Sequence, residues 1–295
     1  MSFRSKCSST FVLALIVCVP AWSQAQELRY KFQNGSKTAY IMEQNQSMKI
    51  PIGGQETDIK VNMLFEVSQT VDSVDTATGT AKLKQKYDRV KMSIKGPIEM
   101  EYDSKGDKEP DGPLAAMAGI FKALTNNEIK MTMTNRGEIS DVKMPEKLLE
   151  ELKQQSGGNA DVFGNMLSEE SLKHMLNQGS MVLPKEAPVA EKTVWDRNLD
   201  MKMGNMGTIK TNSKYTYAGK SGGFDKIDMK MDIKLESDPN AAMQINMKTK
   251  EANGTVLFDN EKGRIQEINT KVISEMQMEP IGMMNMTQTM TMKLK

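Results

Sequence analysis

Asp228–Glu236 reads DMKMDIKLE, and apolar and charged residues alternate at every position of this stretch. Successive side chains of a β-strand point to opposite faces, so an extended chain here has one apolar and one charged face. A strand buried on both faces would be apolar throughout. The stretch therefore predicts a half-solvated strand in an antiparallel sheet.

The same alternation recurs in Ile59–Val67, in Met243–Met247 and in Met284–Leu294. Several of these segments exceed the usual strand length, and long strands twist and curl. Near Tyr87–Val90 the apolar positions change from odd to even numbers, which indicates a β-bulge. We therefore predict an α+β protein, predominantly antiparallel β, whose main element is a long curved sheet resembling a half-barrel.

The middle of the chain has helical periodicity. Leu114, Met117, Phe121 and Leu124 recur at helical spacing, and Pro145 and Ser168 are start signals for two further helices. We expect a signal peptide at 1–25, a first β half at 26–112, a mainly helical insert at 113–178 with a hairpin near 127–143, and a second β half at 179–295. We expect the insert on or near the concave face.

The two β halves are predicted to be related. Ile129–Val142 and Thr255–Val272 each read as a strand, a polar turn that ends in glycine, and a second strand. Each segment also follows a set of long amphipathic strands, which indicates an internal duplication. The alternative is that two generic hairpins share this pattern, and the halves then form one domain without being related.

The N-terminus has the order of features found in secretory signal peptides. Arg4 and Lys6 are followed by Phe11–Val19, an apolar segment too short to span a bilayer. Small residues then precede an expected cleavage site between Ala25 and Gln26. We therefore predict an exported protein, in the periplasm or outside the cell.

Cysteine and charge narrow the possible chemistry. The two cysteines, Cys7 and Cys18, both fall inside the expected signal peptide, so the mature chain has no disulfide and no thiolate site. Lipoprotein anchoring through Cys18 is disfavoured, because Val17 stands where a small residue is expected. The 295-residue chain carries 39 basic and 38 acidic residues, a balance that does not favour nucleic acid. No later segment is apolar enough to predict a transmembrane span.

A set of turn and strand motifs resembles an uncharacterised family of exported bacterial proteins, one defined only as a domain of unknown function. The motifs are Leu183-Pro184-Lys185-Glu186-Ala187-Pro188-Val189, then Trp195, then Tyr215-Thr216-Tyr217, with a closing hairpin at Gly254–Asp259 and Gly263–Ile265. The resemblance implies export and β-structure. It implies no activity.

Methionine is the compositional anomaly, with 27 residues. Its flexible, polarizable side chain suits surfaces that adapt to varied apolar partners. We therefore predict that a Met-rich concave face binds an apolar ligand. The candidate lining residues are Met63, Phe65, Met229, Met231, Met243, Met247, Met290 and Met292. The alternative is that these side chains fill an ordinary core, the commoner role of an apolar stripe.

Other chemistries have weaker support. Met-x-Met pairs such as Met131/Met133 suit Cu(I), but any half-buried strand gives the same spacing. The loop 107–112 resembles a calcium loop, but Ala118 stands where a bidentate Glu is required. His174, the only histidine, accompanies no nucleophile-elbow motif. We assign no catalytic residue, no cofactor and no metal ligand.

Three functions follow, in order of preference. The first is an exported non-enzymatic protein that binds a lipid or another apolar small molecule. The second is a structural or interaction protein of the cell envelope with a filled core. The third is a hydrolase that uses carboxylates. The sequence identifies no protein partner.

The cleavage site gives a direct prediction. Full-length protein expressed in a bacterial host should be recovered outside the cytoplasm with Gln26 as its first residue, because signal peptidase reads the small residues that end at Ala25. Intact-mass measurement of the exported protein checks this. A lipid-modified Cys18, or retention of Met1–Ala25, would contradict it.

Overall fold

The structure is a computed structural model that describes residues 25–107, 113–155, 169–186, 188–202, 207–239, 241, 244–279 and 282–295. Residues 1–24, which hold most of the expected signal peptide, lie outside the described residues, as do Met243 and most of the 107–112 loop. Gln26, the first residue after the expected cleavage site, forms an antiparallel backbone bridge with Val189.

The described residues form twelve strands and three helices. The strands are β1 (Lys37–Ile52), β2 (Gln55–Asp75), β3 (Thr80–Lys95), β4 (Met100–Asp103), β5 (Glu128–Met133), β6 (Ile139–Lys143), β7 (Val194–Lys202), β8 (Gly207–Ser221), β9 (Phe224–Ser237), β10 (Ile245–Asp259), β11 (Arg264–Met278) and β12 (Gly282–Leu294). The helices are α1 (Pro113–Asn126), α2 (Glu146–Gln155) and α4 (Glu169–Ser180).

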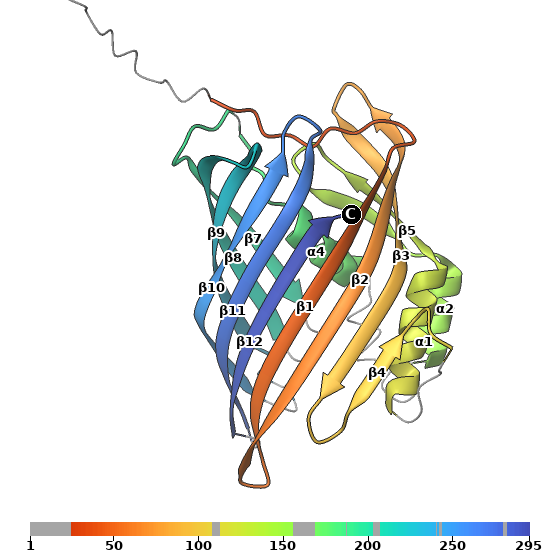
Figure 1. Cartoon of the computed structure of the whole chain (residues 1–295), viewed down its shortest axis with the longest axis vertical. Coiled ribbons are helices and arrows are strands. Elements are labelled where there is room, and N and C mark those ends of the chain that lie inside the picture. Colours follow the sequence, from red (N-terminus) through yellow and green to blue (C-terminus); the bar gives the residue numbers. More distant parts are fainter. Residues whose placement is uncertain are drawn as a thin grey trace, which may run out of the picture.

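All twelve strands belong to one antiparallel sheet with the order β6-β5-β3-β2-β1-β12-β11-β10-β9-β8-β7, and β4 pairs with β3. The first and last long strands, β1 and β12, are neighbours, so the N- and C-terminal parts of the chain meet in the middle of the sheet. Figure 1 shows that the sheet is strongly curved, with β7, β8 and β9 behind the front strands. The predicted antiparallel, curved sheet is confirmed. The relation between two halves and the domain boundaries stay predictions.

Direct cross-strand partners show how the alternation builds a common interior. One row crosses eight strands in register and carries Val90, Phe65, Met42, Met292, Ile268, Val256, Ile227 and Tyr217. Such side chains lie about 5 Å apart between Cβ atoms, close enough to pack. The row defines the inner face of the sheet, and the intervening polar residues define the outer face.

The predicted β-bulge is confirmed. The pairing of β2 with β3 shifts between Glu66 and Val67, because Arg89 pairs with Glu66 and Tyr87 pairs with Val67. Asp88 is the extra residue. Without this insertion, Leu83 and Val90 would point to opposite faces, whereas both are buried.

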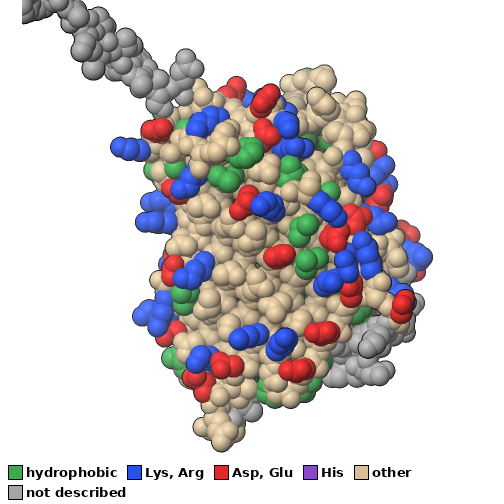
Figure 2. All heavy atoms as spheres, viewed as in Figure 1, with side chains coloured by type: hydrophobic (Ala, Val, Ile, Leu, Met, Phe, Trp, Pro, Cys, Tyr) green, Lys and Arg blue, Asp and Glu red, His purple; other side chains and the backbone are tan. Residues whose placement is uncertain are grey.

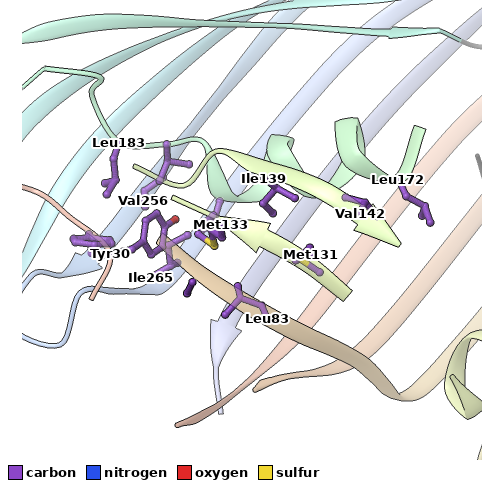
Figure 3. Packing of buried hydrophobic residues seen from close by; sticks show 14 of the residues in the cluster. Tyr30, Leu83, Met131, Met133, Ile139, Val142, Leu172, Leu183, Val256 and Ile265 are labelled. Carbon is purple, nitrogen blue, oxygen red and sulfur yellow. The ribbon is translucent and has the colours of Figure 1, made fainter. Parts of the chain in front are cut away.

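The core fills one end of the inner face, called the packed end here. Leu28 and Tyr30 enter this end from the segment before β1, and the ring of Tyr30 contacts Phe258 edge to face. Figure 3 shows Tyr30 near Val256 and Ile265, with Met131, Met133 and Ile139 beside them. The packed end therefore joins side chains from both ends of the sheet order.

Helix α4 lies between β6 and β7, the two edge strands of the sheet. On the β6 side, the Ile139 N–H donates to Asn177 Oδ1 at 2.8 Å, and Asn177 Nδ2 donates to the Ile139 carbonyl at 3.1 Å. Ser180 Oγ donates to the carbonyl of Gly137 at 2.7 Å. Gly137 has φ +87°, and a Cβ there would collide with the Ser180 carbonyl, so only glycine fits.

The segment after α4 binds the opposite edge. Trp195 Nε1, on β7, donates to the Val182 carbonyl at 3.2 Å. Arg197 of β7 donates from Nε and Nη2 to the Leu183 carbonyl, at 3.0 and 2.6 Å. Together with the bonds to β6, these contacts fasten the two edges of the curved sheet to one helix and its C-terminal extension.

Helix α1 packs against β3, and α2 packs against α1. Phe121 of α1 is buried against Val90 and Met92 on the inner face of β3, and α1 also contacts α2. Pro113 occupies the first position of α1, where its missing N–H is not needed. These helices, with α4, lie in the region where the sequence predicts a helical insert.

Asn177 should be a large contributor to stability. Asn177→Ala leaves the buried N–H and C=O of Ile139 without the side-chain partner, and we expect a loss of roughly 1–3 kcal/mol in the free energy of unfolding. Urea unfolding followed by Trp195 fluorescence measures the loss. Gln178→Ala, an exposed neighbour on the same helix, is the matched control. Equal unfolding midpoints for the two variants would refute the role of Asn177.

Candidate ligand-binding face

The inner face differs at its two ends. At the end opposite the packed end, where β1 turns into β2 at the bottom of Figure 1, its apolar side chains are only half-buried. We call this region the distal inner face. Its half-buried residues are Met48, Ile50, Ile59, Val61, Leu199, Met201, Ile209, Ile233, Leu235, Ile245, Met247, Met276, Met278 and Met286. Among the described residues, neither buried cluster, with the side chains packed on it, includes any of this set.

Sheet register aligns these side chains in rows. Met247 pairs with Met276 and Met276 with Met284, so three methionines cross three strands side by side. Met247 and Met276 are half-buried, and Met284 is buried. On the far side of the curve, Leu235 pairs with Ile209 and Ile209 with Met201. Flexible thioether side chains on a half-exposed face can change rotamer to fit an apolar surface. The rows are therefore suited to contact with an apolar molecule.

The residues predicted to line the ligand site fall in several places. Met229 is buried in the packed core, and Met231, Met290 and Met292 pack against that core. Met63 and Phe65 pack against the smaller buried cluster that includes Phe121. Met247 lies on the distal inner face. Met243 lies outside the described residues.

Several residues of the distal inner face are absent from the predicted set. Met276, Met278 and Met286 belong to alternating segments that mark their face, but alternation does not tell which end of a strand lies in the core. That depends on cross-strand register and on where the segment at Leu28–Tyr30 enters. A single sequence carries no signal for either.

A small polar group interrupts the apolar rows. Gln46 and Gln288 are direct cross-strand partners on β1 and β12. Gln46 Nε2 donates to Met286 Sδ at 2.8 Å, and a thioether is a weak acceptor. Ser274 follows on β11, opposite Met286; it is 1% exposed, and its Oγ has no hydrogen-bond partner among the described residues.

Arg197 is the charged residue on this part of the inner face, and it is occupied. Its side chain is 3% exposed, and Nη1 donates to Glu138 Oε1 at 3.0 Å. Its Nε and Nη2 both bind the Leu183 carbonyl. Arg197 therefore joins the strand edges, and its hydrogen-bonding capacity is mostly used within the protein.

Two hollows lie beside β2 and β3. The larger, of about 530 Å³, crosses two rows of cross-strand partners: Glu43, Leu64, Lys91 and Asp103, and then Asn45, Asn62, Ser93 and Glu101. The other, of about 480 Å³, includes Ser73, Asp75 and Lys82. Figure 2 shows this side of the molecule, where lysine, arginine, aspartate and glutamate side chains are intermixed. Apolar side chains also line these hollows, Met63, Leu64 and Met92 in the larger and Val74 and Ala81 in the other. Met63 is one of the residues predicted to line the ligand site, and no residue of the distal inner face lines either hollow.

Asp103, at the larger hollow, is paired with two cations. Arg89 donates from Nε to Asp103 Oδ1 at 3.0 Å and from Nη2 to Oδ2 at 2.6 Å, and Lys91 Nζ lies 3.2 Å from Oδ2. These contacts, chiefly the Arg89 hydrogen bonds, hold the pKa of the Asp103 carboxyl well below its ordinary value of 3.8. These contacts with Arg89 and Lys91 are enough to stabilise the Asp103 carboxylate on the sheet. Its position does not require a bound ligand.

Catalytic and metal arrangements have little support in the described residues. Within these residues, no group of three His, Cys, Asp or Glu side chains is placed to hold a metal ion. His174 on α4 has Nε2 3.8 Å from Glu170 Oε1, one helical turn away, and its buried Nδ1 has no partner in the described part of the chain. The contact is a local helix pair and places no nucleophile beside the imidazole.

No helix in the described ranges has the length and apolar character that crossing a membrane requires.

The fold and this face define a class of strand-rich protein with one curved antiparallel sheet. The inner side of the sheet presents an uncharged, half-exposed apolar surface. Residues 78–265 match the model of a family of unknown function, DUF6263. The chain belongs to this family, and the predicted membership of an uncharacterised family is confirmed.

Solved structures resemble the chain only distantly. Lipovitellin, in a structure titled for its lipid–protein interactions, matches 90% of this chain with a TM-score of 0.49 and 12% identity, and the chain spans 25% of that protein's length. DynF from Micromonospora chersina (TM-score 0.24, 7% identity) matches 92% of this chain and 86% of its own. A putative outer membrane lipoprotein-sorting domain from Vibrio parahaemolyticus (0.15, 9%) matches 86% and 83%. A search of curated proteins finds no match. These similarities are too low to assign a function.

The Asp103 pairing predicts a pH dependence. A carboxyl whose pKa is lowered on folding stabilises the native state above its unfolded value of 3.8, and that contribution is lost as pH falls through the folded pKa. Asp103→Asn should therefore lower stability at neutral pH, and its difference from the unmodified protein should shrink below pH 3.8. Urea unfolding across this range tests it. Glu101→Gln, beside the same hollow, is the control; a difference independent of pH would contradict the assignment.

Proposed function

We propose that this chain is an exported, non-enzymatic protein that binds an apolar ligand, such as a lipid, on its distal inner face. The observation that carries the proposal is the half-burial of Met247, Met276 and the other listed side chains of the distal inner face. At the packed end the same kind of side chain is almost fully enclosed. Contiguous exposed apolar surface is rare on soluble proteins that do not use it for binding.

The two ends of the sheet have separate roles in this proposal. At the packed end, Tyr30, Phe258 and the residues around them hold the fold, and α4 fixes the strand edges. That leaves Met247, Met276 and their neighbours free to adapt to a bound molecule, because the core does not depend on them. The predicted signal peptide supports a location where extracytoplasmic lipids occur.

A second function has its own supporting observation. Neither hollow is lined by a residue of the distal inner face, and the packed end is filled. A structural or interaction protein of the cell envelope, with a filled interior and no ligand, would have these features. The binding measurement below separates the two functions.

Ligand binding should be visible directly. Protein purified without detergent should retain a copurified apolar molecule in native mass spectrometry, or should take up a fluorescent naphthylamine probe with an emission shift. Met276→Asp should weaken probe binding by about tenfold or more, because a buried carboxylate without a counter-ion is strongly disfavoured in contact with an apolar ligand.

Gln277→Asp is the matched control, since Gln277 is the exposed neighbour on the outer face of the same strand. It should bind the probe like the unmodified protein. Folded protein that carries no ligand and binds no probe would refute the proposal and favour the structural role.

A further inference from the structure

Building on the proposed function, we infer that the ligand is an uncharged amphiphile, with a neutral polar group on an apolar chain. The structure assigns the polar group to Gln46, Gln288 and Ser274, and the apolar chain to the methionine rows that run from there to the distal end.

The first argument is charge. From the row of Met42 and Met292 to the distal turns, the described inner positions of β1, β2 and β7–β12 carry one charged side chain, Arg197. Its guanidinium is bound to the Leu183 carbonyl and to Glu138. The outer face of the front strands holds the lysines and acids shown in Figure 2. The charges are thus segregated to one side of the sheet.

The consequence concerns the ligand's headgroup. A carboxylate or phosphate that moves from water to this face would lose hydration and would meet no unpaired cation among the described inner positions. Burial of an unpaired charge is far less favourable than burial of a neutral polar group that finds hydrogen bonds. The inner face therefore selects against anionic lipids.

The second argument is the polar group itself. Ser274 is 1% exposed and its Oγ lacks a partner among the described residues, although buried hydroxyls are normally hydrogen-bonded. Val272, two residues before Ser274, is the cross-strand partner of Gln288. Ser274 therefore lies diagonally next to the Gln288 amide. Gln46 donates to the weak thioether acceptor of Met286. All three side chains would gain from a ligand that offers hydroxyl or ester oxygens.

The geometry also sets the order of the ligand's parts. Gln46 and Gln288 stand between the packed end and the row Met247, Met276, Met284. An apolar chain whose polar group lies at the glutamines can then extend over the methionines toward the distal turns. The ligand's polar group would lie inside the molecule and its chain nearer the distal end.

Three ligands with the same acyl chain test this inference. Monoolein is neutral and has hydroxyls, methyl oleate is neutral without hydroxyls, and oleate is anionic at about pH 9. Each is used to displace the naphthylamine probe from the protein. We expect monoolein to bind most tightly and oleate to bind about tenfold or more weakly than monoolein.

The variant Gln46→Leu/Gln288→Leu should keep probe binding but lose the preference for monoolein over methyl oleate, and Ser274→Ala should reduce that preference. The matched control is Asn45→Leu/Thr289→Leu, a directly paired set on the outer face of the same two strands. The control should retain the preference. Circular dichroism and unfolding midpoints verify that each variant is folded.

The outcomes separate the two levels of the proposal. If the probe binds but oleate competes as well as monoolein, the headgroup inference is overturned and the proposed function stands. If the glutamine variant keeps the full monoolein preference, the assigned location is overturned. If folded protein binds neither probe nor any of the three lipids, the proposed function fails, and the inference fails with it.

Discussion

The structure depends on the ladder between β1 and β12, which runs in register from Tyr40↔Leu294 to Lys49↔Asn285. This pairing joins strands from opposite ends of the chain and makes one sheet out of what would otherwise be two. A slip of one residue would turn Met42 and Met292 outward and their polar neighbours inward. The alternation of the sequence makes such a slip strongly unfavourable, so register and interior are fixed together.

The two ends of the curved sheet have different roles. The packed end closes because the segment at Leu28–Tyr30 fills it and α4 connects the edge strands, with Asn177 on one side and the Arg197–Leu183 contacts on the other. The distal end has the same kind of side chains but no comparable filling among the described residues. A stable fold and an adaptable apolar surface thus coexist on one face, because different strand segments carry them.

Sequence patterns predicted the sheet well and the site only in part. Alternation in Asp228–Glu236 identifies strand and face, and the change of parity near Asp88 identifies the bulge, because both are local properties. The division of the methionines is not local: Met229 is core whereas Met247 is half-exposed, although both sit in alternating segments. Which methionines lie in the core follows from the cross-strand register and from the position of Tyr30 in the packed end. Both depend on contacts between residues far apart in sequence. The joining of the edges by α4 has the same long-range origin.

The amide of Asn177 has a consequence for the behaviour of the protein at high concentration. By engaging both the N–H and the C=O of Ile139, it occupies backbone groups on an edge strand that could otherwise template a strand from another molecule. If the chain is exported, as its sequence predicts, it must stay soluble without cytoplasmic folding assistance. Helix α4 thus hinders the addition of a strand from another molecule at the β6 edge of the sheet.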